Sequence, residues 1–272
     1  MIHTNAWANP SSAGAQEALQ MAAFLEERSQ FPDQVQVNQA LLAALHLQPG
    51  ERVLEAGCGT GALARLAVGD LETSVILVGV DISPHLLNFA RQTHSLDSRL
   101  HYVAGEAQRL PLASGSFDVA FAARLLLHVD DPLSVVRELS RAVRPAGRIV
   151  LMDWDFETLA VDHPDLDLTR RILHWRNDHH GGNNWSGRQL LRLATRAGLH
   201  APQIIPVTSV ARDEHANLTH SLWRAADVAR EAGAISSEEH NRWIGQIKAS
   251  LEAGIFFASM VYFIVLATRG KS

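Results

Sequence analysis

The strongest constraint on the fold is an apolar run that leads through an acid into three alternating glycines. The run is Val53–Gly61 (VLEAGCGTG), and a helical pattern begins at Ala62. Glycines in such a turn permit backbone conformations and close ligand approach that a β-carbon would block, and the free N–H groups of the helix start face the same ligand. The segment therefore predicts a strand, a nucleotide-binding turn and a helix.

The glycines alone fit two kinds of cofactor. Gly57, Gly59 and Ala62 also match the GxGxxA form of the dinucleotide fingerprint, and Asp81 closes the next apolar run, where its carboxylate can hold ribose hydroxyls. Glu55 separates the two cofactors. A carboxylate beside the turn would repel a pyrophosphate, whereas it suits a ligand with an ammonium and a sulfonium group, as in S-adenosylmethionine.

Strand-like and helical runs alternate between residues 52 and 153. This alternation predicts βαβ units, with a parallel sheet and helices on both of its faces. The expected strands are Arg52–Glu55, Ser74–Asp81, Leu100–Ala104, Phe117–Ala122 and Gly147–Asp153, and the expected helices are Ala62–Val68, Pro84–Thr93 and Leu133–Val143.

Helical segments flank this core on both sides. Residues 1–48 are expected to be N-terminal helices that contribute to a substrate lid, with a break at Pro32, and residues 49–272 are expected to be the core. Within the core, helical cap insertions are predicted at about 156–186 and 213–253. The remaining expected elements are a helical patch at Leu168–Trp175, a helix at Gly187–Ala197, strands at Gln203–Val210 and Val261–Leu266, and a capping box at Ser236.

The composition of the chain argues against nucleic-acid binding, a disulfide framework and a membrane span. The net charge of −5 argues against a surface that neutralises nucleic-acid phosphates, so a small-molecule substrate is expected. A single cysteine, Cys58, excludes an internal disulfide framework. The apolar stretch Gly254–Ala267 is shorter than the roughly 20 residues of a membrane span and is expected to be a buried strand. No secretory signal is visible after Met1, so a cytoplasmic location is predicted.

Four segments together resemble the core of the class I S-adenosylmethionine-dependent methyltransferases, similar to the ubiquinone/menaquinone-biosynthesis (type 11) group. They are Val53–Gly61, Val80–Ser83, Gly105–Pro111 and Phe117–Pro132, in the family's order. The resemblance covers residues 50–153. It implies an α/β, Rossmann-like fold: a seven-stranded, mostly parallel sheet with helices on both faces and a helical cap.

The resemblance also implies roles for individual residues toward S-adenosylmethionine. Glu55 would bind the ammonium group, Asp81 the ribose, and Arg124 the methionine carboxylate or the substrate. Glu106, where the family usually has Asp, would accept the adenine amino group beside the Ala107 N–H. The further cofactor-binding residues expected are Gly57, Cys58, Gly59, Gly61, Ile82 and Ala123.

Histidines are the candidate bases, because a base with a pKa near neutral assists transfer to a hydroxyl or an unactivated carbon. His128 follows the fourth strand and is the best single candidate, although it could equally order the turn at Asp130. His179 and His180 lie in a polar, glycine-bearing loop that could close over substrate, or could be surface histidines.

Other residues are expected at the acceptor. Phe24, Phe31, Trp175 and Trp185 could wall an apolar pocket, or could be ordinary core residues. Arg188 could hold an anionic substrate or pair within the fold. No metal site is predicted, because His174, Asp178 and His179 lack a ligand signature.

The leading hypothesis is methyl transfer from S-adenosylmethionine to a small organic acceptor. The alternatives are a non-methylating enzyme that binds S-adenosylmethionine, and a nicotinamide-dependent oxidoreductase. We expect no nucleic-acid partner and no membrane span, and a homodimer is possible.

Overall fold

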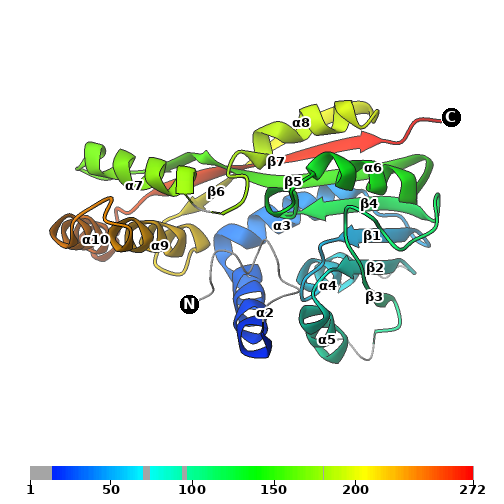
Figure 1. The fold of residues 1–272 in the computed structure, drawn as a ribbon, viewed down its shortest axis with the longest axis horizontal. Coiled ribbons are helices and arrows are strands. Elements are labelled where there is room, and N and C mark those ends of the chain that lie inside the picture. Colours follow the sequence, from blue (N-terminus) through cyan, green and yellow to red (C-terminus); the bar gives the residue numbers. More distant parts are fainter. Residues whose placement is uncertain (1–13, 70–73, 94–96, 180, 272) are drawn as a thin grey trace.

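A seven-stranded sheet forms the centre of the computed structural model, which describes residues 14–69, 74–93, 97–179 and 181–271 (Figure 1). The strand order is β3-β2-β1-β4-β5-β7-β6. Strands β1 to β5 are parallel, whereas β7 is antiparallel to both β5 and β6, so the predicted mostly parallel sheet is confirmed. The strands are β1 Arg52–Ala56, β2 Ile76–Asp81, β3 Leu100–Ala104, β4 Phe117–Ala123, β5 Val143–Val161, β6 His200–Ala211 and β7 Ala258–Thr268.

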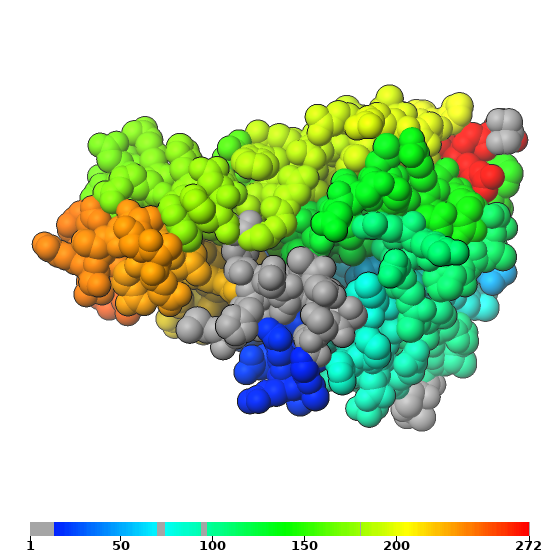
Figure 2. Space-filling view, in the orientation of Figure 1, coloured from blue at the N-terminus to red at the C-terminus, as the bar shows by residue number. Residues whose placement is uncertain are grey.

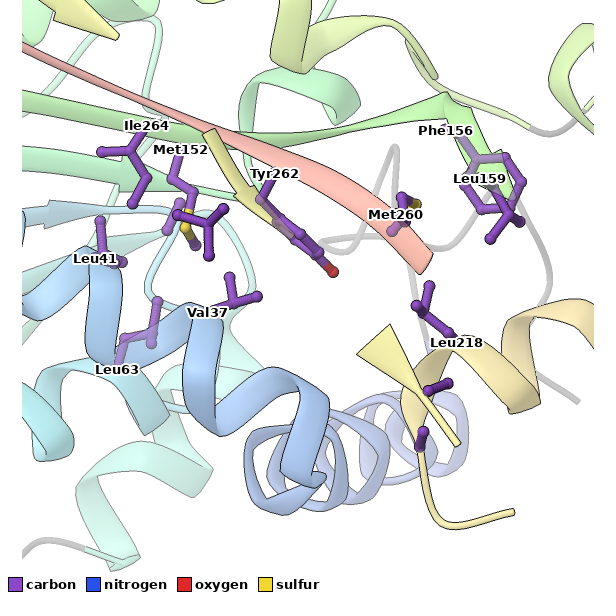
Figure 3. Packing of buried hydrophobic residues seen from close by; sticks show 14 of the residues in the cluster. Val37, Leu41, Leu63, Met152, Phe156, Leu159, Leu218, Met260, Tyr262 and Ile264 are labelled. Carbon is purple, nitrogen blue, oxygen red and sulfur yellow. The ribbon is translucent and has the colours of Figure 1, made fainter. Parts of the chain in front are cut away.

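Helices cover both faces of the sheet. Alternate strand residues point to opposite faces, so Val53 and Val119 pack with α3 and α4, whereas Leu54 and Ala120 pack with α6 and α8. Figure 3 shows the first of these clusters, with α3 below Tyr262 and Ile264 of β7. The helices are α2 Ala15–Gln30, α3 Pro32–Leu45, α4 Ala62–Gly69, α5 Pro84–Thr93, η1 Leu126–His128, α6 Pro132–Ala142, α7 Leu166–His179, α8 Ser186–Arg196, α9 Asn217–Glu231 and α10 Ser237–Glu252.

Strand β5 is longer than predicted. The expected end at Asp153 is wrong, because β5 continues to Val161 and pairs with β7 past a bulge between Asp155 and Ala160. Polar residues at 155, 157 and 158 hide the strand pattern, yet Asp155 is buried and paired with Arg188. The extension carries Phe156, at the start of the expected insertion, beneath the cap helices.

Helices α7, α9 and α10 pack together at the end of the molecule away from β3 (Figures 1 and 2). The predicted capping box of α10 is confirmed: Glu239 N–H donates to Ser236 Oγ over 3.1 Å, and Ser236 N–H to Glu239 Oε2 over 2.8 Å. Buried Asp33 of α3 accepts the Asn217 N–H over 2.9 Å and the Ser209 hydroxyl over 3.0 Å. Asp33 therefore ties the start of α9 to the core and satisfies helix-end donors.

The apolar segment near the C-terminus is the buried strand β7, as predicted. None of the helices that the structure describes is long and apolar enough to cross a bilayer.

Candidate active site

A cavity of about 400 Å³ lies at the carboxyl edge of the parallel strands, where the strand order reverses between β1 and β4. Ligands of open α/β sheets bind at this edge, and the volume suits a small-molecule ligand. Helices α2, α7 and α9 also contribute lining residues. The expected residues that line the cavity are Phe24, Glu55, Gly57, Cys58, Gly59, Asp81, Ile82, Glu106, Ala107, Ala123, Arg124 and His128.

The glycine turn has the backbone that its sequence predicts. Gly57, Gly59 and Gly61 have φ of 72°, 54° and 73°, a region that favours glycine. Gly57 N–H donates to the Val80 carbonyl over 2.7 Å, which holds the turn against β2. Gly61 does not line the cavity; a β-carbon there would overlap the Tyr102 hydroxyl, so its role is to start α4.

Cys58 is a small packing residue rather than a nucleophile. Burial raises the pKa of its thiol well above the ordinary value, so the thiol stays protonated. Its Sγ packs against Gly79, where an added β-carbon would lie only 2.7 Å away.

Asp81 is fixed by backbone donors on both oxygens. Gly59 N–H donates to Oδ2 and Ser83 N–H to Oδ1, each over 2.8 Å. Burial raises the pKa of Asp81, and these hydrogen bonds oppose the rise. These backbone donors hold the carboxylate in one orientation at the cavity.

Glu55 is buried with an unused acceptor. Its side chain lies at the cavity with a residue exposure of 2%, and Oε2 finds no hydrogen-bond donor among the described residues. Desolvation raises the pKa of Glu55 to about 8, although the positive charge of Arg124 acts in the opposite direction. A buried acceptor without a partner is rare, and it indicates a site for a donor from a ligand.

Arg124 presents the opposite charge in the same cavity. It is 8% exposed, and Nη2 donates to Asn38 Oδ1 over 2.9 Å, while Nε and Nη1 have no acceptor in the part of the chain that is described. Its φ of 56° is uncommon for a residue with a β-carbon. Such conformations cost about 1–3 kcal/mol and cluster at ligand sites.

The expected adenine residues surround the same end of the cavity. Ile82 follows Asp81 and is partly exposed to the cavity, and Glu106 and Ala107 lie in the turn after β3. Ala123 ends β4 beside Arg124. The structure therefore brings these predicted residues together from three strand ends.

Only one of the three candidate histidines is shown at the cavity. His128 lines it at the end of η1, and burial together with the charge of Arg28 lowers the pKa of His128 to about 4. His179 instead is exposed, stacks on Trp175 with ring centroids 4.6 Å apart, and does not line the cavity. His180 lies outside the described residues.

Four expected acceptor residues lie away from the cavity. Phe31 stacks on His220 at 5.2 Å, Trp175 on His179, and Trp185 precedes α8. Arg188 pairs with the buried Asp155 and, over 3.0 Å, with Glu157. Its guanidinium is engaged within the fold, so the anion-binding role expected of it is not supported.

Sequence reasoning missed a group of cavity residues brought together by long-range packing. Arg176 is the clearest, because successive helix residues point about 100° apart and Arg176, not Trp175, faces the cavity. The sequence contained a signal for Arg176. Leu168, Ile172 and Arg176 are spaced four residues apart on the buried face of the helix, so a charged residue occupies a position of the apolar stripe. Other missed residues include Arg28, Trp154, Phe156, Asn217, Ser221, Arg224 and Met260.

Among the residues with described positions, no group of three or more His, Cys, Asp or Glu side chains is arranged to hold a metal ion.

Comparison with known proteins agrees with this geometry. Residues 54–151 match the model of the family described as "Methyltransferase domain". The chain is 35% identical over 228 residues to an uncharacterised 37.1 kDa protein of a Streptomyces fradiae transposon, covering 84% of this chain and 65% of that protein. It is 28% identical over 172 residues to an O-methyltransferase of Pyrenophora dematioidea, covering 61% of each. The chain thus spans less than two thirds of the length of these curated relatives.

Among solved structures, the fold is similar to a phosphoethanolamine N-methyltransferase of Haemonchus contortus in complex with S-adenosylhomocysteine. The TM-score is 0.61 at 16% identity, covering 99% of this chain and 61% of the other. At that identity the likeness concerns the fold alone. Residues 54–151 thus match the methyltransferase domain family, and this match, the relatives and the sheet order agree with the expected resemblance to the class I S-adenosylmethionine-dependent methyltransferases of the type 11 group.

Proposed function

We propose that this chain transfers the methyl group of S-adenosylmethionine to a small organic acceptor. The observation that carries the proposal is the pair of buried, incompletely bonded groups in one cavity: Glu55 Oε2, and Nε and Nη1 of Arg124. An α-amino acid carries an ammonium and a carboxylate side by side, and these two groups fit Glu55 and Arg124. A pyrophosphate would place negative charge beside Glu55, which disfavours a dinucleotide.

The rest of the cofactor half supports the same ligand. Asp81 is positioned to accept ribose hydroxyls, and Ile82, Glu106 and Ala107 surround an adjoining space for adenine. Bound S-adenosylmethionine supplies a sulfonium methyl group that is already activated for displacement. The protein therefore needs chiefly to orient the acceptor and exclude water, and orientation can contribute roughly 7–11 kcal/mol to lowering the barrier.

His128 is proposed to contact the acceptor. Because its pKa is lowered to about 4, its imidazole is neutral at pH 7 and one ring nitrogen can accept a hydrogen bond from an acceptor O–H or N–H. The proposed role is to hold and orient that group for the methyl transfer, because an imidazole with a pKa of about 4 is too weak a base to remove its proton.

The test measures S-adenosylhomocysteine and methylated product by mass spectrometry over a panel of small acceptors. The proposal expects both products in equal amounts, a loss of turnover in Arg124→Met, and normal turnover in Glu27→Gln, whose side chain is exposed on α2. Tight S-adenosylhomocysteine binding without methylated product from any acceptor would favour the non-methylating alternative. Saturable binding of NADH without S-adenosylhomocysteine binding would favour the oxidoreductase.

We also propose that the protein acts in the cytoplasm, without a nucleic-acid partner and as a homodimer. The acidic net charge supports the second point. Light scattering of the purified chain tests the dimer, cell fractionation tests the location, and retention on immobilised duplex DNA or RNA at low salt would contradict the absence of a nucleic-acid partner.

A further inference from the structure

We propose that the methyl acceptor carries an oxyanion, a carboxylate or a phosphate, and that Arg176 binds it in a cavity that Arg28 and Arg224 also line. This inference rests on the proposed methyl transfer and names the substrate class. Arg28 comes from α2, Arg176 from α7 and Arg224 from α9, and all three line the cavity.

Arg176 is the centre of this arrangement. It is 7% exposed, and its guanidinium lies 3.0 Å from the centroid of the Phe156 ring. This cation–π contact uses the face of the Phe156 ring, and the N–H groups of a guanidinium can bind in-plane acceptors such as a carboxylate or a phosphate. Nη1 has a long contact of 3.4 Å to Asn184 Oδ1, and Arg176 forms no ion pair with any acid that the structure describes.

Each of Arg176 and Arg28 has a neighbouring arginine of the same charge. Burial and the charge of Arg224 lower the pKa of Arg176, and burial and the charge of Arg124 lower the pKa of Arg28 to about 9, although Tyr262 acts in the opposite direction. Arg28 likewise has no acidic partner in the described part of the chain, and its guanidinium lies over the Phe24 ring at 5.6 Å. A buried cation such as Arg176 is costly without a counter-ion, and a bound anion would reduce that cost.

The acids of the cavity do not supply the missing counter-charge. Glu55, Asp81 and Glu106 lie at the ends of β1, β2 and β3, where the cofactor is proposed to bind, and Asp130 is exposed in the turn after η1. None of them is among the charges that shift the pKa of Arg176 or Arg28.

The other residues that line the cavity indicate the chemistry of the rest of the acceptor molecule. Phe24, Trp154, Phe156 and Met260 are apolar residues that line the cavity. Figure 3 shows Phe156 and Met260 near the start of β7, with Leu218 of α9 below Met260 in this view. The site therefore fits an amphipathic acceptor with an apolar body and an anionic head.

The first experiment measures anion binding without turnover. S-Adenosylhomocysteine-loaded protein is titrated calorimetrically with inorganic phosphate, with benzoate, and with neutral benzamide. The proposal expects saturable binding of one or both anions and not of benzamide, with at least tenfold weaker binding in Arg176→Gln. Preference for phosphate or for benzoate decides between the two head groups.

The second experiment measures turnover with matched acceptors: carboxylic acids, phosphate monoesters, and their neutral amides or esters. The anionic member is expected to be the better substrate. Arg176→Gln should raise its KM about 10–100-fold with a smaller change in kcat and an unchanged S-adenosylhomocysteine affinity. Arg176→Lys should recover part of the loss, and Arg170→Gln, on the exposed side of α7, should match the wild type.

The outcomes separate this inference from the proposed function. Methylation that prefers neutral acceptors, or that is indifferent to Arg176→Gln, overturns the inference while the methyl transfer stands. If no acceptor is methylated, the methyl transfer fails, and the calorimetric titration still decides whether the cavity binds an anion. Should Arg176→Gln fail to fold, Arg28→Gln and Arg176→Lys provide the same comparison.

Discussion

The two halves of the cavity are built in different ways. The cofactor half consists of residues at neighbouring strand ends, Glu55, Asp81 and Ala123, whose positions follow from the backbone pairing of β1, β2 and β4. The acceptor half consists of side chains from α2, α7 and α9. Acids predominate in the first half and arginines in the second. In the proposed assignment the strand ends hold the cofactor and the packed helices bind the acceptor, so substitutions in the two halves should affect different ligands.

Asp81→Ala should have the largest effect and should act on the cofactor alone. It removes the proposed ribose acceptor and leaves the N–H groups of Gly59 and Ser83 without their carboxylate. The expected loss of S-adenosylhomocysteine affinity is about 10³-fold, roughly 4 kcal/mol. Calorimetry checks it, with Asp167→Ala on the surface of α7 as the control. A loss below about tenfold would mean that Asp81 does not hold the ribose.

His128→Ala tests whether His128 contacts the acceptor or the cofactor. We expect kcat to fall about 10²-fold with an unchanged S-adenosylhomocysteine affinity, because the imidazole is proposed to contact the acceptor rather than the cofactor. His85→Ala, exposed on α5, is the control. An equal loss of cofactor affinity would move His128 into the cofactor half.

The pH dependence of cofactor binding follows from Glu55. With a pKa of about 8, the unliganded carboxyl holds a proton at pH 7, and binding an ammonium group favours the ionised form. Binding therefore releases a proton, and S-adenosylhomocysteine affinity should rise by up to about tenfold per unit between pH 6 and pH 8. Glu55→Gln should abolish the rise. A flat wild-type profile would contradict the raised pKa.

Arg188→Gln should have the smallest effect on catalysis. Because Arg188 pairs with Asp155 and Glu157 away from the cavity, the acceptor KM should stay within about twofold of the wild type. Buried Asp155 loses its partner, so the free energy of unfolding should fall by about 1–2 kcal/mol in chemical denaturation. A large rise in acceptor KM at unchanged stability would restore the anion-binding role first expected of Arg188.

The same contrast explains how much the sequence could predict. The fold and the cofactor half follow from local patterns: Glu55, the three glycines and Asp81 each end or follow an apolar strand, and parallel strands bring such ends to one edge. No long-range information is needed to place them together.

The acceptor half depends on information that local patterns do not contain. Arg28, Phe156 and Arg176 are distant in sequence, and only the packing of α7 and α9 around the bulged end of β5 brings them into one cavity. By residue type, Trp175 suits the wall of an apolar pocket and Arg188 suits the binding of an anion. Helix rotation points Trp175 away, and the unforeseen extension of β5 supplies Asp155 as the partner of Arg188.

The most direct test of the central claim compares two ligands on two proteins. 5′-Methylthioadenosine retains the adenosine of S-adenosylhomocysteine but lacks its amino acid group, so Glu55 should recognise one ligand and not the other. Calorimetry should show that Glu55→Gln weakens S-adenosylhomocysteine binding about 100-fold and leaves 5′-methylthioadenosine binding unchanged within about twofold. Equal losses for the two ligands, or no loss for either, would contradict the assignment of Glu55 to the ammonium group and with it this account of the cavity.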